Sequence, residues 1–385
     1  MNIGELHIDK LYIGELQVDK AYLGETLVYG GGEPEPIEVK ALKFEAKTPG
    51  QVLKTASRPT GRNLEYSYNG TTWTNWEDGY EIPFPSNNVI YLRGMNDGLS
   101  TSSTDIFMFN SCSCNVSGNI MHLLDYTQDL TVISVSNAFN SLFRDCKDMT
   151  FDGLRLPATT ISSYCYKNMF SNCTSLVNAP ELPATILKLN CYENMFNNCT
   201  SLVNAPELPA ITLNGNCYSS MFNNCTSLVN APELPATTLT GFCYKNMFSN
   251  CTSLVNAPEL PATTLENYCY QSMFEGCTSL VNAPELPATT LENYCYSSMF
   301  QNCTSLVNAP ELPATTLKTY CYQRMFRSCR NLNNITIKAT DISANGCLSN
   351  WMSSVPAGGT FKCIQGVEYP TGNNGIPNGW TVEYV

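Results

Sequence analysis

The chain has 385 residues, a formal net charge of -12 and only 21 basic residues, which are scattered along the sequence. Nucleic-acid binding needs clustered Lys and Arg, so the composition argues against a nucleic-acid partner. The sequence has no run of about 18 consecutive apolar residues, and we therefore expect no membrane insertion.

Residues 1–30 contain a short internal repeat, IGELHIDKLY, IGELQVDKAY and LGETLVYG. Alternating apolar residues predict three β-strands, with a glycine at each bend. Three strands bury too little surface to fold alone, so the segment is expected to dock on another chain, to trimerise or to stay loosely ordered. It resembles the amino-terminal segments of structural proteins of tailed bacteriophages, which implies attachment to other virion proteins. The candidate anchor residues are Leu6, Ile8, Leu16, Val18 and Leu27.

The start of the chain lacks a basic stretch followed by an apolar one, so ordinary Sec export is not expected if Met1 is the native start.

The segments after residue 30 differ from it in composition. Residues 31–36 consist of Gly, Glu and Pro, a composition typical of a linker. Over residues 37–110, short alternating runs predict a small β-sandwich that resembles an immunoglobulin-like or fibronectin-like module, and Asn69-Gly70 predicts a hairpin within it.

The rest of the chain is a repeat with a period of 26 residues. The block CTSLVNAPELPA occurs six times without change between Cys173 and Ala314, and degenerate copies flank it. Self-similarity at a fixed period predicts a solenoid with irregular capping coils. We therefore predict a mainly β fold with short helical turns, in which about eight coils and an N-terminal cap span residues 111–347. Residues 348–385 are predicted to form the C-terminal cap.

Each coil combines two kinds of segment. TSLVNAPELP predicts an extended stretch in which two prolines lack backbone donors and limit ladder bonding. CYENMFNNC predicts a helical turn, because Cys191, Met195, Phe196 and Cys199 fall at positions i, i+4, i+5 and i+8.

The stretch Met195-Phe196-Asn197-Asn198-Cys199-Thr200-Ser201-Leu202 resembles the BspA-like leucine-rich repeats, also called the Treponema type. The usual form of that repeat ends in Ala-Phe-x-x-Cys-x-x-Leu, and here Met replaces Ala. The resemblance covers roughly residues 103 to 385. It implies a leucine-rich-repeat solenoid, and proteins of this family act as adhesins and binding proteins.

The 19 cysteines allow three interpretations, namely metal ligands, disulfides or small buried apolar residues. The sequence contains two histidines, no C-x-x-C and a single C-x-C at Cys112 and Cys114, which is a poor zinc signature. Stacked thiols need no bridge, because a free cysteine packs as a small hydrophobic residue. Reduced, buried cysteines are favoured, and neither a metal nor a cofactor is expected.

Two sets of repeated positions are candidates for facing a ligand. The like charges of a glutamate column should repel one another. Either Ca²⁺ or cationic ligands relieve this repulsion, or solvation with salt screening does, and solvation is favoured. The positions just before each Cys-Tyr pair vary among coils, either because they form a tunable recognition surface or because exposed positions drift. The candidate residues are Glu181, Glu207, Glu233, Glu259, Glu285, Glu311, Tyr268, Tyr294 and Tyr320.

No Ser, His and Asp constellation and no phosphate-binding loop is found, so the protein is not expected to be an enzyme. The first hypothesis is a bacteriophage virion structural protein, a tail or head fibre that binds a host-surface glycan or protein, with a homotrimer as its candidate assembly. It would be assembled in the host cytoplasm and located in the virion. The alternatives are a bacterial cell-surface BspA-like adhesin, which needs an export signal, and an inert capsid decoration protein.

Overall fold

The structure is a computed structural model that describes residues 2–3, 6–7, 11–13, 16–18, 20–23, 26–30, 39–56, 61–77, 81–102 and 104–385. The chain divides into two compact units, Met1–Lys40 and Ala41–Val385. The linker predicted over residues 31–36 lies outside the described residues.

The first unit consists of paired short strands. The strands are β1 (Asn2–Ile3), β2 (Leu6–His7), β3 (Leu11–Ile13), β4 (Leu16–Val18), β5 (Lys20–Leu23) and β6 (Thr26–Gly30). Each odd-numbered strand pairs in antiparallel fashion with the strand that follows it. Three strands were expected here, and this number was wrong, because six short strands form three antiparallel pairs; in the sequence, a Gly-Glu dipeptide stands between the two strands of each pair. Of the candidate anchor residues, Ile8 lies outside the described residues and the other four lie in these strands.

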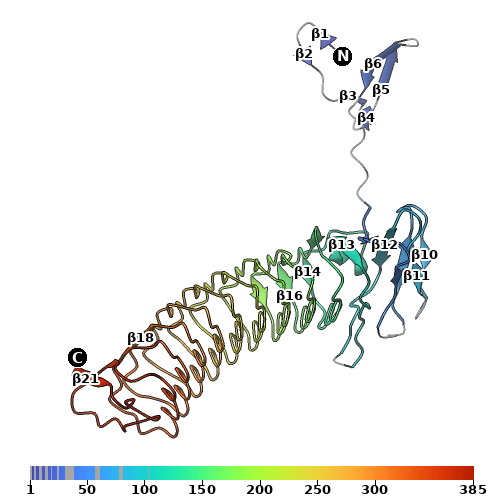
Figure 1. Cartoon of the computed structure of the whole chain (residues 1–385). Coiled ribbons are helices and arrows are strands. Elements are labelled where there is room, and N and C mark those ends of the chain that lie inside the picture. Colours follow the sequence, from blue (N-terminus) through green and yellow to red (C-terminus); the bar gives the residue numbers. More distant parts are fainter. Residues whose placement is uncertain are drawn as a thin grey trace. The chain divides into compact units, whose positions relative to one another are not determined.

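The second unit begins with a six-stranded sheet in the order β10-β9-β12-β7-β13-β15 and a two-stranded sheet, β11-β8 (Figure 1). The strands are β7 (Leu42–Ala46), β8 (Val52–Leu53), β9 (Leu64–Ser67), β10 (Thr74–Asn75), β11 (Ile82–Pro83), β12 (Val89–Gly94), β13 (Cys114–Asn119) and β15 (Leu154–Arg155). The hairpin expected at Asn69-Gly70 is confirmed by the antiparallel pairing of β9 with β10. The immunoglobulin-like sandwich stays a prediction.

Strand β13 joins this β-rich region to the repeats. It pairs in antiparallel fashion with β7 on one side and in parallel fashion with β15 on the other. One continuous sheet therefore contains strands from both sides of the boundary predicted between residues 110 and 111. Buried aromatic residues extend across the same junction, where the Phe109 ring stacks on Phe143 with ring centroids 5.4 Å apart.

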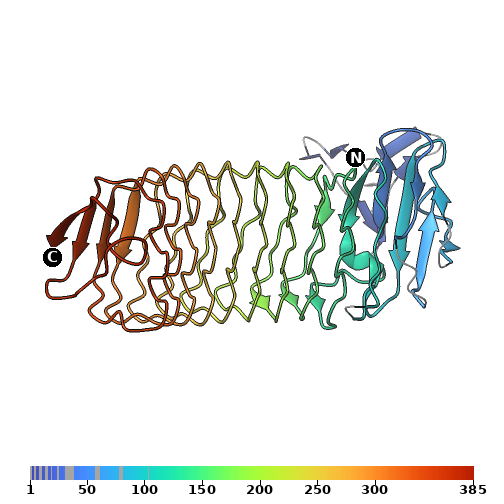
Figure 2. The same cartoon turned by 60° about the horizontal axis from the view of Figure 1, so that its bottom comes forward.

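The repeats form a stack of coils that lie side by side (Figures 1 and 2). Identical positions of successive coils stack on one another in the core. The ring centroids of Phe196 and Phe222 lie 5.6 Å apart, and those of Tyr192 and Tyr218 lie 5.8 Å apart, with nearly parallel rings in both pairs. Because each coil buries its apolar face mainly against its neighbours, the array has a core only as a stack.

Regular strands occur mainly near the two ends of the array. They are β14 (Val132–Ile133), β16 (Thr160–Ile161), β17 (Ile186–Leu187), β18 (Asn308–Leu312), β19 (Asn334–Ile337), β20 (Thr360–Cys363) and β21 (Thr381–Tyr384), all in parallel pairs. Between Asn178 and Asn308, the extended segments are joined through single bridges between equivalent asparagines. This agrees with the expectation that the prolines of each segment restrict ladder bonding.

The helical turn expected in each coil is wrong. In the coil of Cys191, every fourth residue is left-handed, at Asn190, Asn194 and Asn198, with φ of 58°, 56° and 61°. Alternate N–H groups bond in different directions: Met195 N donates to Tyr192 O three residues back, whereas Phe196 N donates to Met221 O in the next coil. A left-handed residue interrupts a right-handed helix and directs these donors sideways. The one helix among the described residues is the short 3-10 helix η1 (Ile120–Leu123).

Candidate functional site

The turn edge of the array carries its most unusual backbone feature. One column of left-handed residues precedes the first cysteine of each coil, which Tyr follows in every coil but the last: Tyr164, Asn190, Asn216, Phe242, Tyr268, Tyr294, Tyr320 and Gly346. Gly and Asn adopt this conformation readily, whereas bulky residues rarely do. The aromatic members of the column therefore need a compensating interaction.

Stacking supplies that interaction for all of them except Tyr164, whose ring centroid lies 5.6 Å from Lys167 Nζ. The rings of Phe242, Tyr268, Tyr294 and Tyr320, here called the aromatic ladder, lie 4.6, 4.7 and 4.9 Å apart between centroids, with interplanar angles of 7°, 10° and 25°. Each aromatic pair is worth about 0.5–1.5 kcal/mol beyond burial, whereas a left-handed conformation costs about 1–2 kcal/mol per residue. Since an inner ring stacks on two neighbours, the two effects nearly cancel. The aromatic ladder is thus tolerated by the fold with little net gain.

The surroundings of the aromatic ladder decide which atoms a ligand reaches. A side chain at Gly346 would overlap the ring of Tyr320, so glycine lets this ring lie directly over the next coil. Lys245 Nζ lies 5.4 Å from the ring centroid of Phe242 and 5.9 Å from that of Tyr268. Ring faces within the aromatic ladder are turned toward one another, and its residues are half-buried. The ring edges and the tyrosine hydroxyls are therefore the groups presented to solvent.

The protonation of Tyr294 suits hydrogen bonding. Desolvation raises the pKa of Tyr294, and the neighbouring phenols of Tyr268 and Tyr320 raise it further. The hydroxyl is consequently neutral near pH 7, and a neutral phenol both donates and accepts a hydrogen bond.

The column from Glu181 to Glu311 lies on the extended segment of the coil, away in sequence from the turn edge, and all six carboxylates are exposed. Glu181 and Glu207 line a shallow hollow of about 360 Å³ together with Leu182, Pro183 and Pro209. The last member of the column forms an ion pair with Lys338 at 2.6 Å. The glutamate and tyrosine candidates therefore belong to two separate segments of each coil.

The repeated cysteines are buried and serve the core. Cys199 Sγ donates to Phe170 O of the preceding coil at 3.1 Å, and the same contact recurs along the second cysteine column. Burial raises the pKa of the Cys165 thiol to about 12. Among the residues that the structure describes, no group of three or more His, Cys, Asp or Glu side chains is arranged to hold a metal ion.

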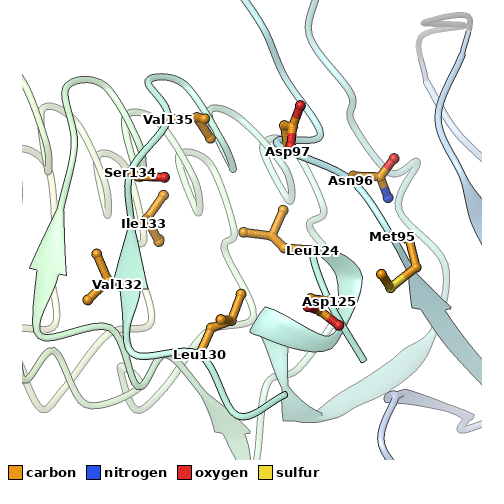
Figure 3. A pocket seen from close by; sticks show the side chains of 10 residues that line it. All are labelled: Met95, Asn96, Asp97, Leu124, Asp125, Leu130, Val132, Ile133, Ser134 and Val135. Carbon is orange, nitrogen blue, oxygen red and sulfur yellow. The ribbon is translucent and has the colours of Figure 1, made fainter. Parts of the chain in front are cut away.

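A hollow of about 410 Å³ lies at the junction between the β-rich region and the first coils (Figure 3). Met95, Asn96 and Asp97 lie on one side of it, and the segment that contains the edge strand β14 lies on the other. Its residues were not identified from the sequence, because they belong to segments without a repeat or motif. The lining includes Asp97, Asp125 and Ser134 but neither His nor Cys, so it offers polar contacts and no thiol or imidazole nucleophile.

In the described part of the chain, no helix has the length and apolar character needed to cross a membrane. Neither the curated proteins nor the solved structures contain a match to the chain. The model of the BspA type leucine rich repeat region, with six copies of the repeat, matches residues 124–255 and 244–355. These residues make up more than half of the chain and include the aromatic ladder. The protein therefore belongs to the BspA-type leucine-rich-repeat family.

Proposed function

We propose that this protein is a non-enzymatic adhesion protein of a bacteriophage virion, whose array binds a host-surface glycan along the aromatic ladder. Residues 1–30 attach the chain to other virion proteins, and the repeats present the ladder outward. The protein forms a tail or head fibre of the virion and acts without a cofactor, a nucleic-acid partner or membrane insertion.

The observation that carries the binding proposal is the change from Asn to aromatic residues in one left-handed column. Asn190 and Asn216 occupy that column in neighbouring coils, and their φ values of 58° and 57° match those of the tyrosines. Core packing does not require the rings, because the Asn-bearing coils stack on the same Tyr, Phe and Cys columns. A surface feature that brings little net stability is a candidate for binding.

The chemistry of the ladder favours a glycan. Stacked rings leave their edges and a row of hydroxyls, and the hydroxyls of successive coils match the many donors and acceptors of a sugar chain. Tyr supplies contact area with little side-chain entropy to lose, which is why it is frequent in protein binding surfaces as well. A host-surface protein is therefore the second candidate ligand.

The test uses a variant that the chain itself suggests. Changing Tyr268, Tyr294 and Tyr320 together to Asn restores the residue that other coils carry at this position, so the array is expected to remain folded. The full chain and the variant are compared for binding to host cells and to purified surface polysaccharide. A loss of about tenfold or more in affinity for the polysaccharide supports the proposal, by analogy with the removal of several tyrosine contacts. Unchanged binding contradicts it, and binding that survives removal of the glycans assigns the ligand to protein.

A matched control addresses the other candidate set. Changing Glu233, Glu259 and Glu285 to Gln removes charge from the extended segment and leaves the aromatic ladder intact. This variant is expected to bind as the unchanged chain does. If it loses binding and the tyrosine variant does not, the ligand binds the glutamate column instead.

The virion assignment rests on the resemblance of residues 1–30 to tailed-phage structural proteins. Mass spectrometry and electron microscopy of purified particles should detect the protein, and a chain without residues 1–30 should fail to incorporate. Incorporation of the truncated chain into particles would contradict the role of residues 1–30 as the virion anchor. Chemical cross-linking of the full chain in solution tests whether it forms a homotrimer.

The second candidate function is a bacterial cell-surface adhesin, which family membership favours because BspA-type repeats suggest a surface adhesion-like protein. Detection of the protein on intact bacterial cells and its absence from particles would favour this candidate. Presence in particles without any binding to host cells would instead favour an inert capsid decoration protein.

A further inference from the structure

The C-x-C motif at residues 112–114 brings two thiols together outside the repeated columns. Cys112 Sγ lies 3.2 Å from Cys114 Sγ, and Cys114 N donates to Cys112 O at 2.9 Å. This backbone bond closes a three-residue turn that holds both side chains on one side. Among the 19 cysteines, all of which the structure describes, no other pair of thiols is joined by a hydrogen bond.

The segment that carries the pair is fixed from both sides. Ser113 O accepts from Lys47 N at 2.9 Å, and Ser113 N donates to Gln51 Oε1 at 2.9 Å. On the other side, Asp148 N donates to Ser111 Oγ at 2.9 Å. Because these contacts already order the turn, formation of a bond between the two sulfurs needs little further loss of chain entropy.

The two thiols differ in protonation and access. The hydrogen bond between the two thiols lowers the pKa of Cys112, whereas the same bond and burial raise the pKa of Cys114. Cys112 is 7% exposed, whereas Cys114 and Cys173 are 0% exposed. Thiol–disulfide exchange depends on access to the thiolate, so Cys112 is the better placed of the two to attack, and Cys114 is placed to resolve the intermediate.

We propose that Cys112 and Cys114 form a thiol–disulfide exchange site that closes to an intramolecular disulfide with a small-molecule disulfide such as oxidised glutathione. The Cys112 thiolate attacks one glutathione sulfur, the glutathione S–S bond breaks, and the first glutathione leaves as a thiolate that takes up a proton. Cys114 then gives up its proton and attacks Cys112 Sγ, which releases the second glutathione. The two protein thiols are oxidised, and one glutathione disulfide is reduced to two glutathione thiols.

The position of the pair gives the reaction a structural consequence. Cys114 is the first residue of β13, its carbonyl accepts from Thr150 N of the first coils, and it pairs with Ala46 of β7. A disulfide between Cys112 and Cys114 would close a small ring within the segment that connects the β-rich region to the array. Oxidising surroundings therefore favour the closed ring in this segment, and reducing surroundings favour the open dithiol.

The experiment uses the full-length protein, reduced and then incubated with oxidised glutathione under native conditions. Remaining thiols are alkylated after unfolding, and peptides are mapped by mass spectrometry. The peptide that contains Cys112 and Cys114 is expected to lose the mass of two hydrogens and to escape alkylation. Cys173 and Cys199, which are buried in the same protein, serve as internal controls and should be alkylated fully. Full alkylation of the Cys112 peptide, or equal oxidation of the controls, overturns the proposal.

Two variants separate the roles of the thiols. Cys114→Ser should accumulate glutathione on Cys112, at least about tenfold faster than Cys173 reacts, because only an accessible thiolate reacts rapidly. Cys112→Ser should leave Cys114 without glutathione over the same time. Glutathione on Cys114 at the rate of Cys112 contradicts the assigned order of attack. Since the main measurement is made on the unchanged chain, poor folding of a variant does not affect it.

Discussion

The buried tyrosine column offers a direct test of the core, because five of its seven members end in hydroxyls that make no hydrogen bond to described protein atoms. Tyr218 is 1% exposed, and its Oη has no partner among the residues that the structure describes; four other tyrosines of the column share this property. Leaving a buried polar group unpaired costs about 1–3 kcal/mol. Since the ring keeps its stacking contacts, Tyr218→Phe is expected to raise the free energy of unfolding by about 1 kcal/mol.

The matched control is Tyr369, which is also buried but donates its hydroxyl to Ala339 O at 2.7 Å. Tyr369→Phe removes this bond and leaves the carbonyl unpaired, so the free energy of unfolding should fall by about 1 kcal/mol. Urea unfolding followed by circular dichroism measures both changes. If Tyr218→Phe destabilises the protein as much as Tyr369→Phe does, the hydroxyl of Tyr218 has a partner, such as a buried water, and the reasoning is refuted.

Two further predictions concern pH and the end of the aromatic ladder. Burial raises the pKa of the Cys165 thiol to about 12, so above about pH 8.5, where an unfolded thiol ionises, the folded state holds more protons than the unfolded state. The urea midpoint should therefore fall as the pH rises from about 8.5 toward 12; a constant midpoint up to about pH 10 would contradict this. Gly346→Ala should lower the melting temperature more than Gly366→Ala does, because both residues have positive φ but only at Gly346 does a new Cβ overlap a ring, that of Tyr320. Equal losses would show that the Tyr320 ring moves aside freely.

The sequence determined the periodic part of the protein. Cysteines at a constant step of 26 predicted a stack of equivalent coils, and residues 26 positions apart do stack on one another in the core. The prolines of the block CTSLVNAPELPA also predicted that the extended segments would pair only in part. These features follow from sequence alone because the same local sequence makes the same contacts in every coil.

The candidate site was predicted only in part. Variation before each Cys-Tyr pair indicated Tyr268, Tyr294 and Tyr320, but neither Phe242 as the fourth ring nor Gly346 as the residue beneath the last ring was identified. Both depend on contacts between residues 26 positions apart, and they become visible only once the coils are stacked. The contact between Cys112 and Cys114 likewise depends on a turn that Lys47 and Gln51 hold from another part of the chain.

The tertiary structure alone decided the conformation of the turn edge. The spacing of Cys191, Met195 and Phe196 fits one face of a helix, and nothing in that spacing excludes one. Stacking offers the backbone a different set of partners, since alternate N–H groups reach carbonyls of the next coil when every fourth residue is left-handed. Hydrogen bonding between coils therefore replaces hydrogen bonding within a helix, and the choice between them depends on a neighbouring coil that no single repeat contains.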